Sequence, residues 1–160
     1  MKRSAFVEHF KDLYEHSPWV AEQVFDLGVS KALDHRQALL EAFQKTMLQA
    51  SERQQLQLIC AHPDLAGKAA IQGELTAAST SEQAGAGIGE CTADEFSRFT
   101  KLNQAYKDKF GFPFIKAVKG SDRHQILEAF ETRIDNDAEH EFAQALEEIN
   151  KIASFRMADM

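Results

Sequence analysis

The segment His62-Pro63-Asp64-Leu65-Ala66-Gly67-Lys68 places an imidazole beside two residues that interrupt regular backbone. The residue before a proline is pushed out of right-handed helical geometry. A helix that starts at about Ser51 should therefore end at His62, where the ring can face a cleft. Because an unperturbed histidine titrates near neutral pH, His62 is a candidate proton donor or acceptor. The alternative is a helix-terminal ring that bonds to a nearby carbonyl group.

Glu82 is the candidate acid, and it follows a run of hydroxyl residues that begins at Ser79. Ser79 and Glu82 fit the capping-box pattern, which needs no substrate. The small residues Ala84-Gly85-Ala86-Gly87 come next. Such residues weaken a helix but let a ligand approach the backbone closely. The pattern is therefore compatible with a plain helix cap and with the polar mouth of a binding site.

A second irregular stretch runs from Gly111 to Gly120, where apolar side chains are bracketed by glycines and interrupted by a proline. We expect an extended buried segment over about residues 112–119. Its backbone N–H and C=O groups would lack the partners of a helix or sheet and could hold a small polar heterocycle, with Phe114 and Ile115 as the candidates. The alternative is that Phe112, Phe114 and Ile115 simply fill the core, with internal partners for their backbone.

Two further groups of polar residues call for an interpretation. Arg156 lies near the carboxyl end of the last predicted helix, where a cation usually interacts with the helix dipole. His124 and Glu128 have a spacing found in metal sites. Without additional ligands nearby in the pattern, we interpret them and the remaining histidines as surface groups.

The chain as a whole predicts an all-α fold, a single compact domain over residues 1–160 with about eight helices. Polar capping residues recur before apolar residues spaced three and four apart. The predicted helix starts include Asp34, Ser51, Ser79, Thr92, Ser121 and Asn136.

Composition excludes several classes of protein. Hydrophobic residues make up 44% of the 160 residues, and no apolar stretch approaches the ~20 residues that cross a bilayer. The formal charge of -7, without basic clusters, argues against nucleic acid as a partner. Cys60 and Cys91 form no CxxC pair, and no leader peptide is recognisable, so we expect a cytoplasmic protein.

The chain resembles the 2-oxo-4-hydroxy-4-carboxy-5-ureidoimidazoline (OHCU) decarboxylases of urate degradation. The resemblance covers nearly the whole length, and several separate motifs carry it in the right order. They are Tyr14 to Trp19, His62 to Lys68, Glu74 to Thr76 with Ser79, Glu82 and Gln83, and Leu102 to Ile115.

The resemblance implies a cofactor-free decarboxylation of OHCU to (S)-allantoin and carbon dioxide in a protein that is frequently a homodimer. It implies urate oxidase and hydroxyisourate hydrolase as pathway neighbours. It also implies site roles: His62 is the catalytic histidine and Glu82 its carboxylate partner, and the substrate contacts are Pro63, Ser79, Arg156 and backbone groups around Phe114 and Ile115.

The substrate's chemistry agrees with this reading, since its own imine can take the electron pair left by carbon dioxide, without a cofactor or a metal. Two alternatives remain open on the sequence. One is a non-catalytic helical module that binds a small ligand or a partner, and the other is a metal-assisted hydrolase that uses His62 and Glu82.

Overall fold

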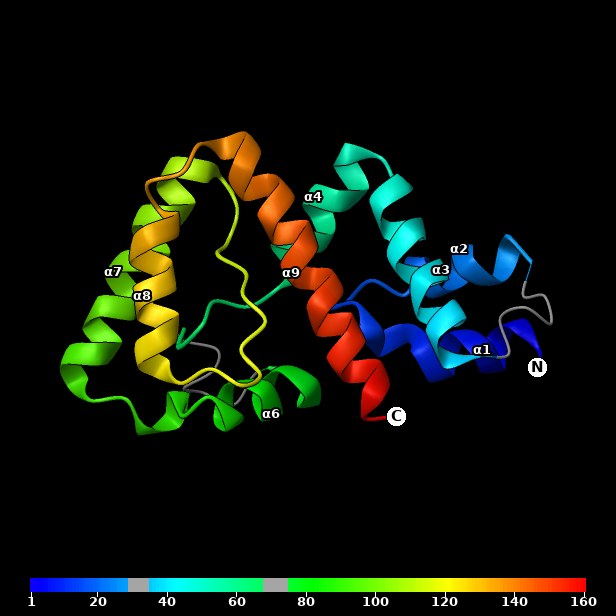
Figure 1. Cartoon of the computed structure of the whole chain (residues 1–160), viewed down its shortest axis with the longest axis horizontal. Helices are drawn as coiled ribbons and strands as arrows, with labels where there is room; N and C mark the ends of the chain where they lie inside the picture. The colour runs from blue at the N-terminus through cyan, green and yellow to red at the C-terminus, as the bar shows by residue number, and fades with distance from the viewer. Residues whose placement is uncertain (29–34, 68–74) are drawn as a thin grey trace. The chain divides into compact units, whose positions relative to one another are not determined.

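The structure is a computed structural model that describes residues 1–28, 35–67 and 75–160. Every regular element in these ranges is a helix, which confirms the predicted all-α fold. The elements, labelled in Figure 1, are α1 (Arg3–Phe10), η1 (Lys11–Leu13), α2 (Trp19–Asp26), α3 (Arg36–Gln49), α4 (Glu52–Ala61), α6 (Ala77–Gly85), η3 (Ile88–Glu90), α7 (Ala93–Phe110), α8 (Arg123–Arg133) and α9 (Ala138–Ala158). Among the described residues, no helix is both long and apolar enough to cross a membrane.

The described residues divide into two compact units. The first comprises residues 1–61 and 149–160, and the second comprises residues 62–148. His62 is thus the first residue of the second unit. Helix α9 contributes its first half to the second unit and its last turns to the first.

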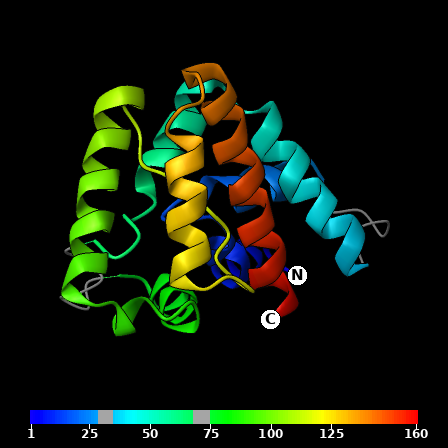
Figure 2. The ribbon, with the colours of Figure 1, turned by 60° about the vertical axis from the view of Figure 1, so that its left-hand side comes forward.

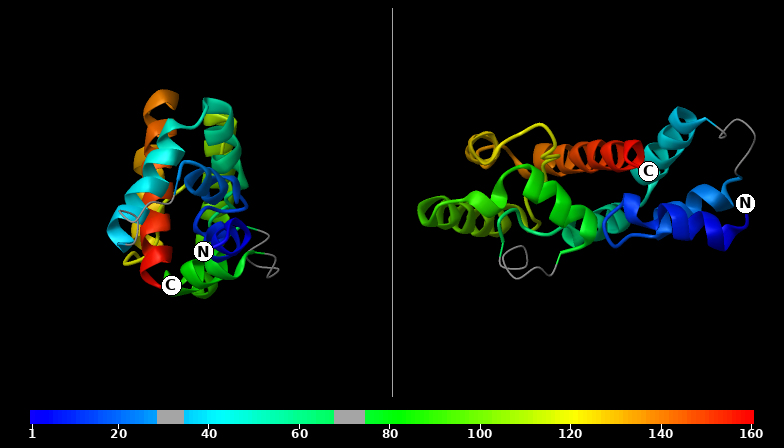
Figure 3. Two further views of the ribbon diagram at one scale, coloured as in Figure 1. Left: turned by 90° about the vertical axis from the view of Figure 1, so that its right-hand side faces the viewer. Right: turned by 90° about the horizontal axis from the view of Figure 1, so that it is seen from below.

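The first unit is built around aromatic side chains of its early helices. Helix α2 packs against both α1 and α3, and Figure 3 shows α1 and α2 side by side. The buried ring of Phe6 stacks on that of Phe43 in α3, with ring centroids 6.1 Å apart. The Tyr14 hydroxyl donates to Asn150 Oδ1 at 2.9 Å, which ties the last turns of α9 to the chain after η1.

The second unit has its own aromatic core. Helices α7 and α8 lie side by side in Figures 1 and 2. The ring of Phe114 stacks on that of Phe130 in α8, with centroids 3.9 Å apart. Tyr106 of α7 meets both rings edge-on. All three side chains are buried, and aromatic pairs of this kind contribute beyond the area that they bury.

Both predicted breaks in helical backbone are present. Helix α4 begins at the predicted capping box, in which Ser51 Oγ accepts from Gln54 N at 3.2 Å and Gln54 Oε1 accepts from Ser51 N at 3.3 Å. It ends at Ala61, so His62 is the first residue beyond it. Residues 111–120 contain neither helix nor strand, and Figure 1 shows them as an extended trace.

Three predicted helix starts are wrong by one to three residues. The sequence placed the caps at Ser79, Ser121 and Asn136, whereas the structure places them at Thr76, Asp122 and Asp137. In each case a neighbouring side-chain oxygen reaches the N–H three residues on. Which oxygen does so depends on the path of the backbone before the helix. The start predicted at Asp34 lies outside the described residues.

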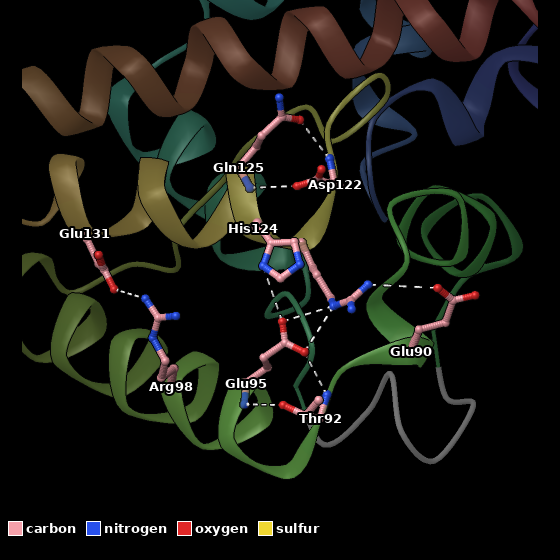
Figure 4. A network of polar contacts seen from close by, with 9 residues as sticks. Glu90, Thr92, Glu95, Arg98, Asp122, His124, Gln125 and Glu131 are labelled. Atoms are coloured by element: carbon pink, nitrogen blue, oxygen red, sulfur yellow. Dashed lines mark hydrogen bonds and ion pairs between the residues drawn. The ribbon is translucent and has the colours of Figure 1, made fainter.

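The predicted cap at Thr92 is correct, and it belongs to a wider polar network shown in Figure 4. Thr92 N donates to Glu95 Oε1 at 2.9 Å, and Glu95 N donates to Thr92 Oγ1 at 3.2 Å. Arg123 of α8 donates to the same carboxylate at 3.0 Å. The backbone N–H of Thr92 and, after it, the guanidinium of Arg123 hold the pKa of Glu95 below its ordinary value. One carboxylate therefore joins the first turns of α7 and α8.

We predict that this carboxylate makes the fold sensitive to acid. Because the pKa of Glu95 is lower in the folded chain, its stabilising contribution is present above the unfolded pKa and is lost as pH falls through the folded one. Thermal midpoints measured between pH 7 and pH 3 should fall further in the wild type than in Glu95→Gln. Glu90→Gln, which alters a carboxylate 3.9 Å from the same arginine, is the control and should follow the wild type. Parallel curves for wild type and Glu95→Gln would contradict the prediction.

Candidate active site

The segment after His62 forms a tight loop with unusual backbone geometry. His62 is buried, with 9% of its surface exposed. Ala66 has a positive φ of 53°, which is uncommon outside glycine. A Cβ atom on Gly67 would lie 2.7 Å from Asp64 Cβ, so this position admits only glycine without a shift of the loop. The loop therefore turns tightly at Ala66 and needs glycine at position 67.

Gln83 of α6 clamps this loop through both ends of its side-chain amide. Its Oε1 accepts from Ala66 N at 3.1 Å, and its Nε2 donates to Asp64 O at 3.3 Å. Gln83 and Ala66 are both buried. A buried N–H and C=O must find partners, and here one side chain satisfies both. The loop that follows His62 is thus held directly against α6.

Helix α6 also carries the two other polar residues predicted for the site. Ser79 and Gln83 are four residues apart and Ser79 and Glu82 three apart, so all three lie on one side of the helix. Ser79 is buried. Thr76 is the N-cap, and its side chain accepts from Ser79 N at 3.2 Å. Glu82 is therefore not the acid of a capping box, and that alternative interpretation is wrong.

Helix α7 holds the other side of the loop. Asn103, which is buried, donates from Nδ2 to Leu65 O at 2.9 Å. One turn later, Lys107 Nζ lies 2.7 Å from Asp64 Oδ2. The loop is thus anchored from two helices, through backbone atoms of three successive residues and one carboxylate. These contacts fix the path of the chain directly after His62.

The extended segment is held by a third helix. Arg133 at the end of α8 donates from Nη1 to Ile115 O at 2.6 Å. The side chains of Phe112, Phe114 and Ile115 are buried, so the side-chain part of the core interpretation is confirmed. The expectation of internal backbone partners is confirmed, within the described part of the chain, for the Ile115 carbonyl alone among the N–H and C=O groups of Phe114 and Ile115. The backbone N–H groups of both residues donate to no described residue. The segment therefore combines apolar anchoring with backbone donors that no described part of the chain uses.

Arg156 belongs to the first unit, whereas the other predicted site residues belong to the second. Its guanidinium donates to Glu15 Oε2 at 2.7 Å and to Asp12 O at 3.0 Å. Glu15 is 2% exposed, so this is a buried ion pair. Two of the five guanidinium N–H groups make these contacts, and they orient the planar group. The predicted role of Arg156 as a substrate contact stays a prediction.

His124 and Glu128 both lie exposed on α8. His124 lies with its Nδ1 3.6 Å from Glu95 Oε2, and its side chain is 67% exposed. Figure 4 shows the His124 ring beside the Glu95 carboxylate. Over the described ranges, no group of three or more His, Cys, Asp or Glu residues could hold a metal ion. The interpretation of His124 and Glu128 as surface groups therefore agrees with the described structure.

Sequence reasoning assigned no structural role to the residues that hold the candidate residues in place. They are Gln83, Asn103, Arg133 and Glu141 in the second unit, and Glu15, the partner of Arg156, in the first. For Glu141 a signal was available. The spacing of Glu141, Ala145, Ile149 and Ile152 places this acid on the buried face of α9, where a charged side chain needs partners. For Gln83 the sequence held no comparable signal, because the loop atoms that Gln83 contacts are 17 and 19 residues away.

Comparison with known proteins gives matches over nearly the whole chain. The OHCU decarboxylase family profile matches residues 1–158. A 2-oxo-4-hydroxy-4-carboxy-5-ureidoimidazoline decarboxylase of Haloferax volcanii is 39% identical over 97% of this chain and 88% of its own length. A uric acid degradation bifunctional protein of a Bacillus species is 39% identical over the full chain, which spans 30% of that protein.

A solved structure gives the same result for the fold. The crystal structure of an OHCU decarboxylase in the presence of (S)-allantoin aligns with a TM-score of 0.75 and 26% identity, over 94% of this chain and 95% of the other. Agreement of this extent in both sequence and backbone defines a class of small helical decarboxylases. The chain belongs to the OHCU decarboxylase family.

We predict that Gln83 stabilises the loop after His62. Gln83→Met removes both hydrogen bonds, so the unfolding free energy should fall by roughly 2 kcal/mol in chemical denaturation. Hydrogen exchange at the Ala66 amide should become faster. The control is Gln104→Met, which removes an exposed hydrogen bond to Asp108 and should change stability by less than about 0.5 kcal/mol. Unchanged exchange at Ala66 would mean that the amide does not hold the loop.

Proposed function

We propose that this chain catalyses the decarboxylation of OHCU to (S)-allantoin and carbon dioxide, without a cofactor. The observation that carries the proposal is the Gln83 clamp, because it holds the loop after His62 against the helix that bears Ser79 and Glu82. Membership of the OHCU decarboxylase family supports the same reaction.

The substrate itself supplies the electron sink for this reaction. The bond between C4 and the carboxylate breaks, and its electron pair forms a double bond between C4 and C5 while the imine nitrogen takes a proton. The resulting enol then gains a proton on C5, which carries the ureido group, and loses its hydroxyl proton to become the ketone. The protein has to bind the substrate in one orientation and manage these protons.

His62 is the proposed proton donor to the ring carbon. Its ring follows the end of α4 and is buried, and the loop beyond it is anchored from two helices. A donor held on one side of the ring adds the proton to one face, which produces one enantiomer. Decay in water has no such preference. Glu82 is proposed to accept N–H bonds from the ureido group.

The remaining proposed contacts bind and orient the substrate. Backbone N–H groups of Phe114 and Ile115 are suited to the carbonyl oxygens of the heterocycle, since they donate to no described residue. Ser79 is proposed to hydrogen-bond to the substrate, and Pro63 to pack on the ring. Arg156, oriented by the buried Glu15, is proposed to bind a negatively charged or carbonyl group of the substrate.

Three broader expectations from the sequence stay proposals. The whole chain is proposed to be one OHCU decarboxylase-like domain, which the match over residues 1–158 supports. It is proposed to act as a homodimer in the cytoplasm, without a nucleic-acid partner. Urate oxidase and hydroxyisourate hydrolase are proposed to supply its substrate.

The test of this function is optical. Urate oxidase and hydroxyisourate hydrolase generate OHCU in the cuvette, and circular dichroism records the appearance of (S)-allantoin. We expect the wild type to produce early optical activity and His62→Asn to lower its rate by at least roughly 100-fold. His35→Asn, at an exposed residue, should match the wild type. A wild type that yields racemic product at the uncatalysed rate would leave a non-catalytic binding module as the better reading.

A second prediction concerns Arg156. Arg156→Ala should raise KM by about ten-fold with a smaller change in kcat, because a charge-assisted contact with the substrate is lost. Glu15→Gln should raise KM in the same direction, since the guanidinium loses its ionic partner. Arg36→Ala is the matched control, because Arg36 donates to the backbone of Met160 from an exposed position. An unchanged KM in Arg156→Ala would mean that this arginine only secures the end of α9.

A further inference from the structure

Glu141 is a buried carboxylate that is not among the proposed catalytic residues. Glu141 of α9 is 0% exposed and accepts hydrogen bonds on both oxygens. Its Oε1 accepts from Tyr106 Oη at 2.6 Å and from Arg133 Nε at 2.9 Å, and its Oε2 accepts from Asn136 Nδ2 at 3.1 Å. The charge is thus fully partnered, as a buried charge must be.

The same arginine reaches the extended segment in two ways. Its Nη1 donates to Ile115 O at 2.6 Å, and its guanidinium lies 4.4 Å from the centre of the Phe114 ring. The arginine therefore joins the Glu141 carboxylate to the backbone and the ring of two residues in the proposed site. No backbone–backbone hydrogen bond to a described residue holds residues 112–117. Among the described contacts, this side chain is what fixes the peptide after Ile115.

Peptide geometry extends this constraint to a donor. The peptide unit is planar and trans, so its C=O and N–H point in opposite directions. The C=O of Ile115 points to Arg133, and the N–H of the same unit belongs to Lys116. Fixing the carbonyl therefore fixes the direction of the Lys116 N–H, which donates to no described residue. Arg133 therefore sets the plane of the Ile115–Lys116 peptide and with it the direction of the Lys116 N–H group.

Stability alone does not account for this arrangement. A buried ion pair is a weak source of stability, because removing two charges from water costs about as much as their attraction returns. An apolar trio of similar volume would fill the same space between α7, α8 and α9. Arg133, however, has a second partner, the Ile115 carbonyl of the extended segment. An apolar side chain could not form that hydrogen bond.

We propose that Arg133, held by the buried Glu141, is a positioning residue that fixes the Ile115–Lys116 peptide for binding of the substrate heterocycle. The inference rests on the proposed function and adds to it a residue that acts through the backbone of the extended segment. Arg133 acts on the backbone N–H groups of the extended segment. Tyr106 and Asn136 donate the other hydrogen bonds to the Glu141 carboxylate.

The first test compares Arg133→Lys with the wild type. Lysine keeps the positive charge beside Glu141, but a single ammonium lacks the planar fork that reaches the carboxylate and the Ile115 carbonyl together. We expect KM to rise by about ten-fold with less effect on kcat. The dissociation constant of (S)-allantoin, measured by calorimetry, should rise in parallel. In the wild type, the amide signal of Lys116 should shift on addition of (S)-allantoin, and this shift should diminish in the variant.

A triple variant separates positioning from stability. Tyr106→Phe, Arg133→Met and Glu141→Leu together replace the network with apolar side chains, so no buried charge is left without a partner. We expect its thermal midpoint to recover relative to Arg133→Met alone while KM stays raised. If KM returned to the wild-type value together with stability, the arginine would be structural and the inference would be overturned.

Arg98→Met removes a surface ion pair with Glu131 between α7 and α8, and it should leave KM unchanged. A wild type that forms no (S)-allantoin defeats the proposed function. A wild type that forms it, with KM and allantoin affinity unchanged in Arg133→Lys, defeats this inference alone.

Discussion

The arrangement of the second unit depends on one constraint, the pair of hydrogen bonds through which Gln83 holds the loop after His62. The loop after α4 is irregular and has a positive φ at Ala66. Its backbone N–H and C=O groups therefore cannot pair within a helix and need other partners. A single amide supplies a donor and an acceptor at the right separation. Without these two hydrogen bonds, the loop after His62 would lose the contacts that hold it to α6, the helix that bears Ser79 and Glu82.

Helix α7 serves both irregular segments at once. Asn103 holds the loop through Leu65, and Tyr106, one turn further on, meets the carboxylate that orients Arg133. Residues three apart lie on the same side of a helix, so one rigid element sets two otherwise unrelated stretches of backbone. This is a general way to build a binding site from irregular chain, since function concentrates in loops that a scaffold positions.

Much of the fold could be predicted from local patterns. The helix break before Pro63, the extended stretch after Gly111 and the capping box at Thr92 were all predicted correctly, because each follows from the conformational limits of one or two residues. The cap of α6 was not. Ser79 and Thr76 are both good capping residues, and the sequence offers no local reason to prefer one.

The sequence by itself determined the class of fold and the family, because helical periodicity is local and the motifs stand in a fixed order along the chain. Only the tertiary structure decided which groups hold the site. Gln83 meets Ala66 across seventeen residues, and Arg133 meets Ile115 across eighteen. Contacts of this kind depend on how helices pack, and packing fixes side-chain partners that neither composition nor spacing encodes.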